Sequence, residues 1–150
     1  MSHGAYFDND LMAELTTIKA STEIYEQRLL VTGIFDDKAL YDKFLAGVKK
    51  IKGVKQLYWH VLYMPEAEQK RRAKEMIDWK DALLLDTEAG LSLVKTRGVA
   101  DVNYRVAVDA FSTVYLLGRA RSQEELKKAL AMVRGTKGVK RVVNYVVVRP

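Results

Sequence analysis

Side chains capable of acid–base or metal chemistry are few in this 150-residue chain. Its only histidines are His3 and His60, and it has no cysteine, so neither a histidine-rich nor a thiolate zinc site is expected. His60 stands beside Trp59 in an apolar run, where a hydrogen-bonded structural role is expected. No phosphate-binding loop, Gly-x-Ser-x-Gly elbow or His-Glu-x-x-His motif occurs. The residue inventory predicts a protein that is not an enzyme and that has no cofactor.

Two acidic groupings have simple structural explanations. Asp36 and Asp37 precede an amphipathic run, so a helix N-cap is a better interpretation than an acid–base couple. Asp8, Asp10 and Glu14 could supply oxygen ligands to a cation, but acids are routine near the positive N-terminal end of a helix. Neither grouping predicts a catalytic site.

Basic residues give the strongest chemical signal. The formal net charge of +6 predicts attraction to polyanions such as phospholipid surfaces, nucleic acid or anionic polymers. The candidate binding residues crowd the ends of two expected helices and are Lys49, Lys50, Lys52 and Lys55 in the first, and Lys137, Lys140 and Arg141 in the second. A solvated face, with cations stabilising a helix C-terminus, is the simpler interpretation. The functional one is a membrane or partner surface, since each basic residue near an anionic membrane contributes about 1 kcal/mol.

Nucleic acid is not an expected partner. Charge alone would permit it, but the chain has no aromatic RNP-like motif and no recognition helix.

An internal repeat explains why the basic groups recur. Residues 30–63 align with residues 115–148 at a constant offset of 85 residues, without an insertion. A constant register through strand, helix and strand indicates duplication of a whole supersecondary unit. Four glycines follow the repeat at strand and helix ends, where we expect them to serve backbone conformation and not phosphate binding; they are Gly33, Gly53, Gly118 and Gly138.

Hydrophobic periodicity predicts the elements of the first copy. Residues 9–19 have apolar side chains at helical spacing, and residues 23–35 read as one apolar strand ending near a glycine. A helix capped by Asp37 follows, and residues 54–63 return as a strand. The spacing ahead of the glycine is shorter than in the second copy. The first strand of this copy is therefore expected to be shortened or missing.

A charged segment, residues 65–77, should join the two copies as a helical connector. Its ion pairs are predicted at helical spacing, Glu66 with Lys70 and Glu68 with Arg72. Helical structure is expected to continue to Val94, and the face predicted to be buried consists of Ile77, Leu84, Leu91 and Val94.

The second copy has the clearer pattern. Alternation from Val102 to Val108, a turn at residues 109–112 and a second apolar run predict a β-hairpin. Residues 122–125, Ser-Gln-Glu-Glu, are a capping box that opens a helix, and residues 139–148 form the last strand. Because the last strand returns through a helix, both helices should cover one face of a small mixed sheet.

This second copy resembles a BON domain. The matching pieces are the hairpin ending in Val114-Tyr115-Leu116-Leu117-Gly118-Arg119-Ala120, the helix after it, and Gly138-Val139-Lys140-Arg141-Val142-Val143-Asn144. The resemblance covers residues 78–149, and a weaker one covers residues 9–64, where Trp59 stands in place of Asn144. It implies an α/β (α+β) protein of two tandem BON-like modules, each a mixed two- to three-stranded sheet with helices on one face.

The resemblance also implies a function. It is similar to two-BON proteins linked to phospholipid binding, envelope integrity and stress tolerance, which implies a non-catalytic protein of the periplasm or the outer-membrane surface. The expected partners are an anionic phospholipid surface or an envelope protein, and a homo-oligomer is left open. The alternative is a periplasmic chaperone-like or scaffold protein that binds other proteins through an apolar sheet face. Residues 1–4 do not begin a secretory signal, and no cysteine is available for a lipid anchor.

Overall fold

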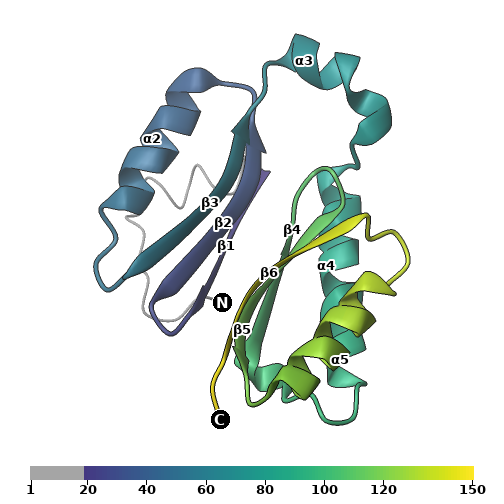
Figure 1. Cartoon of the computed structure of the whole chain (residues 1–150). Coiled ribbons are helices and arrows are strands. Elements are labelled where there is room, and N and C mark those ends of the chain that lie inside the picture. The colour runs from purple at the N-terminus through teal and green to yellow at the C-terminus, as the bar shows by residue number, and fades with distance from the viewer. Residues whose placement is uncertain (1–18) are drawn as a thin grey trace. The chain divides into compact units, whose positions relative to one another are not determined.

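A computed structural model describes residues 19–150, in two compact units that divide between Glu75 and Met76 (Figure 1). The elements of unit 1 are β1 (Lys19–Tyr25), β2 (Arg28–Phe35), α2 (Lys38–Lys49), β3 (Gln56–Tyr63), α3 (Glu66–Arg71) and the 3-10 turn η1 (Ala73–Glu75). Those of unit 2 are α4 (Trp79–Val94), the 3-10 turn η2 (Asp101–Asn103), β4 (Tyr104–Val108), β5 (Thr113–Ala120), α5 (Gln123–Arg134) and β6 (Arg141–Val148).

Each unit contains one three-stranded mixed sheet. The orders are β1-β2-β3 and β4-β5-β6, and the middle strand pairs antiparallel with its hairpin partner and parallel with the last strand. In unit 2, α4 and α5 lie on the same face of the sheet (Figure 1). The predicted α+β class with small mixed sheets is confirmed.

The repeat is a structural repeat. The elements β2, α2 and β3 begin and end 85 residues before β5, α5 and β6. The parallel pairing has the same register in both units, since Arg28 lies opposite Gln56 and Thr113 lies opposite Arg141. Asp37 and Ser122 cap the two equivalent helices, as predicted, by accepting hydrogen bonds from first-turn backbone N–H groups.

The first strand of unit 1 is present, so the prediction that it is shortened or missing was wrong. β1 pairs along its whole length with β2, from Lys19 opposite Ile34 to Tyr25 opposite Arg28. The supposed single strand of residues 23–35 is a hairpin, whose turn is formed by two residues in left-handed conformations, Glu26 (φ 50°) and Gln27 (φ 64°). Neither has the Asn-Gly chemistry that marks such a turn in a sequence. The predicted helix lies outside the described residues, except for Lys19, which belongs to β1.

Two predictions in unit 2 were also wrong. The strand begins at Tyr104, and Val102 lies in η2 with 72% of its surface exposed. Helix α4 buries Ala82, Leu85, Ala89 and Leu93 and leaves Leu84, Leu91 and Val94 exposed. Because α4 is apolar on several sides, periodicity could not select the buried side, and the small alanines let the helix lie close to the sheet. Ile77, from the predicted face, does pack at the edge of the core.

The charged segment between the sheets is helical over Glu66–Arg71, as predicted. Lys70 pairs with Glu66 at 3.2 Å, but Glu68 pairs with Arg71, three residues on, and Arg72 pairs with Glu75. The close partner of Glu68 is therefore Arg71, and Arg72 acts on Glu68 only as a nearby charge. The division between units falls after Glu75, within the predicted connector of residues 65–77, and the separate standing of this connector stays a prediction.

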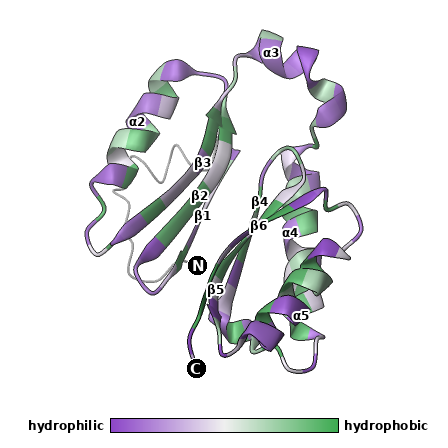
Figure 2. Cartoon of the chain, viewed as in Figure 1, coloured by the Kyte–Doolittle hydropathy of each residue, from purple (hydrophilic) through white to green (hydrophobic). Residues whose placement is uncertain are grey.

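The two cores are filled differently. In unit 1, α2 covers the sheet with an aromatic cluster in which Phe35 stacks on Phe44 at 5.3 Å and Trp59 donates a hydrogen bond to the Tyr41 hydroxyl at 3.1 Å. In unit 2 the core is aliphatic and lies between the sheet and its two helices. Strand β2 is largely hydrophobic, and α3 is largely hydrophilic (Figure 2). Trp59 thus fills the core position whose equivalent in unit 2 is Asn144.

Candidate functional site: two basic loops beside the hairpin turns

The basic residues of unit 2 gather in one loop between α5 and β6. We name residues 134–141 the basic loop of unit 2. It contains Arg134, Lys137, Lys140 and Arg141, all exposed, and no acidic residue. Among the described residues, Lys137 and Lys140 form no ion pair, and Arg141 donates a long hydrogen bond of 3.4 Å to the hydroxyl of Thr113. The structure therefore brings together the three residues predicted for this copy and leaves their charge available.

The loop between α2 and β3 has the same character. We name residues 49–55 the basic loop of unit 1. Lys49, Lys50, Lys52 and Lys55 are exposed there, again without an acidic neighbour in the loop. Three of these lysines coincide, after the 85-residue shift, with Arg134, Lys137 and Lys140. The duplication has kept both the fold and the placement of the charges.

A backbone hydrogen bond fixes each basic loop to the hairpin turn of its own unit. The N–H of Lys55 donates to the carbonyl of Gln27 at 2.7 Å, and the N–H of Lys140 donates to the carbonyl of Ser112 at 3.0 Å. Gln27 and Ser112 are equivalent in the repeat, and both have a left-handed backbone, with φ of 64° and 61°. The basic residues of each unit therefore lie in a loop whose backbone is hydrogen-bonded to the neighbouring hairpin turn. No sequence pattern predicted a role for these carbonyl groups, because their position depends on the conformation of the turn and not on residue type.

Asp109 organises the hairpin turn of unit 2 from inside. Its buried carboxylate accepts hydrogen bonds from the N–H groups of Phe111 (2.8 Å) and Thr113 (3.0 Å) and from the Tyr115 hydroxyl (2.9 Å). Burial, together with the neighbouring carboxylate, raises the pKa of Tyr115, so its hydroxyl remains a donor. The turn that receives Lys140 is thus held rigidly.

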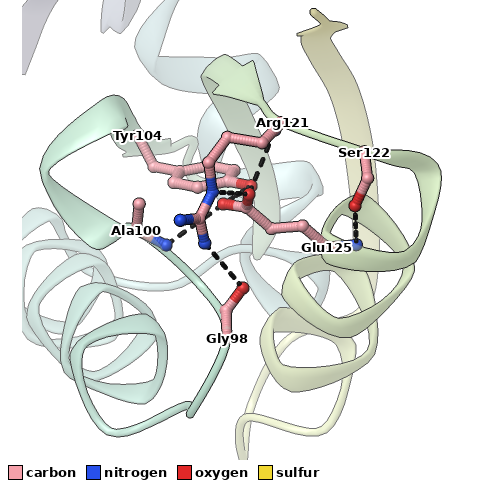
Figure 3. Close-up of polar contacts among 6 residues, drawn as sticks. All are labelled: Gly98, Ala100, Tyr104, Arg121, Ser122 and Glu125. Carbon is pink, nitrogen blue, oxygen red and sulfur yellow. Dashed lines mark hydrogen bonds and ion pairs between the residues drawn. The ribbon is translucent and has the colours of Figure 1, made fainter. Parts of the chain in front are cut away.

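A second buried carboxylate, Glu125, lies at the opposite end of α5 from the basic loop (Figure 3). One oxygen, Oε1, accepts from the backbone N–H and the Nε of Arg121, at 3.0 and 2.7 Å. The other, Oε2, accepts from the backbone N–H of Ala100 and from the Tyr104 hydroxyl, at 3.1 and 2.9 Å. Arg121 also donates to the carbonyl of Gly98 at 3.2 Å. We call these residues the Glu125 clamp; it joins the loop after α4, the start of β4 and the first turn of α5.

The pKa shifts of Glu125 and Tyr104 indicate that the Glu125 clamp has a structural role. Burial alone raises the pKa of Glu125, but the hydrogen bonds from Arg121, Ala100 and Tyr104 outweigh burial and lower the pKa to about 2. Burial and the nearby carboxylate raise the pKa of Tyr104. Glu125 is therefore ionised and Tyr104 protonated near neutral pH, with every carboxylate oxygen occupied by donors from the chain. Such a group holds elements together and has no free position for a substrate proton. Sequence reasoning placed Glu125 in the capping box and missed its distant partners.

Within residues 19–150, no three histidine, aspartate or glutamate side chains converge on a point where a metal ion could bind. Over the same residues, no helix has the length and apolar character needed to cross a membrane. The exposed cations of the two basic loops can attract an anionic surface or partner.

Part of the chain matches a known protein family. Residues 88–150 match the family model of the BON domain. The C-terminal unit is therefore similar to a BON domain over most of its length.

Two further comparisons give more distant likenesses. The chain is 27% identical over 135 residues to a protein of Anaplasma centrale named "Uncharacterized protein in gshII 5'region", covering 84% of this chain and 79% of that protein. Among solved structures, CdsD, a structural protein of the type III secretion system of Chlamydia trachomatis, aligns with a TM-score of 0.40 and 11% identity, covering 94% of this chain and 91% of that chain. The CdsD C-terminal domain aligns with a TM-score of 0.39, again with 11% identity, covering 94% and 96%.

Proposed function

We propose that this protein is a non-catalytic module of the bacterial envelope that associates peripherally with anionic phospholipid through its basic loops. The observation that carries the proposal is the repetition of an exposed, acid-free loop of cations at the same position in both units. A merely solvated helix end would not require both loops to lack acids and to be braced against a hairpin turn. We also propose that unit 1 is a second, diverged BON-like domain.

Charge density makes the proposal quantitative. Each lysine or arginine near an anionic bilayer contributes about 1 kcal/mol, so the three residues of unit 2 together contribute about 3 kcal/mol. This attraction acts within a Debye length of about 10 Å at 0.1 M salt. Binding should therefore require anionic lipid and should weaken strongly as salt is raised.

The triple variant Lys137→Glu/Lys140→Glu/Arg141→Glu is expected to lose most vesicle binding. Loss of attraction and new repulsion act at the same surface, so the partition coefficient onto anionic vesicles should fall by about 100-fold or more at low salt. The measurement is co-sedimentation with phosphatidylglycerol vesicles and with neutral vesicles, at low and high salt. Stability should change by less than about 0.5 kcal/mol per substitution, since the positions are exposed.

A matched control separates local from overall charge. Reversing Lys70, Lys74 and Lys127, which are exposed outside the loops, changes the net charge equally and should leave most binding intact. The double variant Lys137→Glu/Lys140→Glu keeps the hydrogen bond between Arg141 and Thr113, so it tests vesicle binding even if the triple variant does not fold. If the triple variant folds and binds normally, the residues of unit 2 are not the site, and Lys49, Lys50, Lys52 and Lys55 become the candidates. If the parent chain does not bind anionic vesicles at low salt, the lipid proposal is wrong and an envelope protein becomes the better candidate partner.

A further inference from the structure

The solvent side of α4 is unusually apolar for a helix on a surface. Leu83, Leu84, Leu91 and Val94 are 48%, 57%, 47% and 58% exposed, while the opposite side of the same helix is buried in the core. These four residues lie on one side of the helix, with exposed Thr87 between Leu84 and Leu91, and we call them the α4 stripe. The equivalent side of α5 is charged, with exposed Glu124, Lys127 and Lys128. A helix that is apolar on both sides normally has a partner on each side.

A shallow groove runs along one side of the stripe. It lies between α4 and α5, has a volume of about 360 Å³, and is lined by Leu91 and Ser92 from one helix and by Ala131 and Met132 from the other. A Cβ added at Gly90 would meet no atom within 4 Å, so the backbone of α4 is open to close approach beside the stripe. The surface therefore offers both apolar side chains and room to receive them.

The charges at the ends of α4 specify the occupant. Exposed Asp78, Lys80 and Asp81 mark its beginning, and exposed Lys95 and Arg97 follow its end. None of these five residues forms an ion pair with another part of the chain that the structure describes. The helix dipole favours acids at the start and cations at the end. It gives no reason for the four exposed aliphatic residues between them.

We propose that the α4 stripe binds the same stripe of a second copy of this chain, with the two helices antiparallel. A two-fold axis beside Thr87 and Glu88 places Leu84 of each copy against Leu91 of the other. It likewise places Leu83 against Val94. The stripe is self-complementary, as an isologous interface requires.

The same axis pairs the charges. Asp81 of one copy meets Lys95 of the other, so two acid–base contacts flank the apolar centre. A parallel pair would instead place Asp81 against Asp81 and Lys95 against Lys95. Equivalent flanks face each other in an antiparallel helix pair, and Asp81, Glu88 and Lys95 occupy one flank at seven-residue spacing. Glu88 therefore faces its own counterpart across the axis.

The full chain should accordingly be a weak, concentration-dependent dimer. The stripe is smaller than a standard interface, so the dissociation constant is expected in the micromolar range. Sedimentation equilibrium over about 5 to about 500 μM measures it, since mass action shifts the population with concentration. Leu91→Asp should abolish the dimer, and Val102→Asp, an equally simple change of an exposed aliphatic residue outside the stripe, should not. Glu88→Gln should tighten it.

Charge exchange tests the antiparallel arrangement. Asp81→Lys and Lys95→Glu should each weaken the dimer about tenfold, because each creates two like-charge contacts. An equimolar mixture of the two variants should form a heterodimer as tight as the parent dimer, since both contacts are then opposite in charge.

Three results would overturn the proposal. A parent chain that is monomeric at every concentration would do so. In that case, weaker vesicle binding of Leu91→Asp would assign the stripe to lipid, and a lower melting temperature of Leu91→Asp would assign it to packing within the chain. A dimer indifferent to Leu91→Asp would have its interface elsewhere. A dimer weakened by both charge variants and not restored by mixing them would not be antiparallel.

Discussion

Gly118→Ala is expected to unfold unit 2 at temperatures at which the parent protein remains folded. Gly118 lies in β5, directly opposite Tyr104 of β4, with φ of 146°. A Cβ built at this position would be 2.1 Å from the carbonyl oxygen of Asn103 and 2.9 Å from the Cα of Tyr104. Both obstacles are backbone, so relief requires the hairpin strands to separate. We expect a loss of at least about 3 kcal/mol, or roughly 15 °C in melting temperature for a unit of this size.

The fold supplies both a reporter and a control. The two tryptophans are Trp59, in the core of unit 1, and Trp79, packed at the core of unit 2, so thermal unfolding followed by fluorescence in a Trp59→Phe background reports on unit 2. Gly90→Ala is the matched control. It adds the same atom where nothing lies within 4 Å, in a helix, and should be neutral or stabilising by up to about 1 kcal/mol. Equal effects of the two variants would show that the close approach of β4 to Gly118 is not what requires glycine.

Glu125→Gln is expected to destabilise unit 2 by about 3 kcal/mol near neutral pH and by much less in acid. The pKa of Glu125 is lowered to about 2, against about 4.3 in an unfolded chain. The ionised group therefore stabilises the fold fully above about pH 4.3, and this contribution is lost as the pH falls toward 2. An amide at this position would also direct its own N–H groups toward donors that now converge on a carboxylate.

The measurement is the difference in unfolding free energy between parent and Glu125→Gln, obtained by urea titration at neutral pH and near pH 2.5. Other carboxylates titrate in this range, and the difference removes their shared contribution. Glu124→Gln is the control at the adjacent position, because Glu124 is exposed and its pairing with Lys128 at 3.7 Å contributes less than about 1 kcal/mol. A difference that stays constant between the two pH values would contradict an ionised clamp.

Local chemistry determined the parts of this protein that could be predicted from its sequence. The 85-residue repeat located β2, α2 and β3 and their equivalents, because alternation in strands and apolar spacing in helices depend on near neighbours. Asp37 and Ser122 were predictable as caps for the same reason, since each bonds N–H groups two or three residues away. The basic loops were visible as charge, and the resemblance to a BON domain rested on local motifs.

Tertiary structure decided what depends on distant partners. β1 exists because a left-handed turn at Glu26 and Gln27 brings it against β2, and residue type did not signal that turn. The buried side of α4 was chosen by contact with the sheet, since the helix is apolar on both sides. Glu125 is joined to Ala100 and Tyr104 across 25 and 21 residues of sequence, and only the folded chain brings such groups within hydrogen-bonding distance. A sequence pattern records the side chains that are available, whereas burial and long-range hydrogen bonds select the ones that are used.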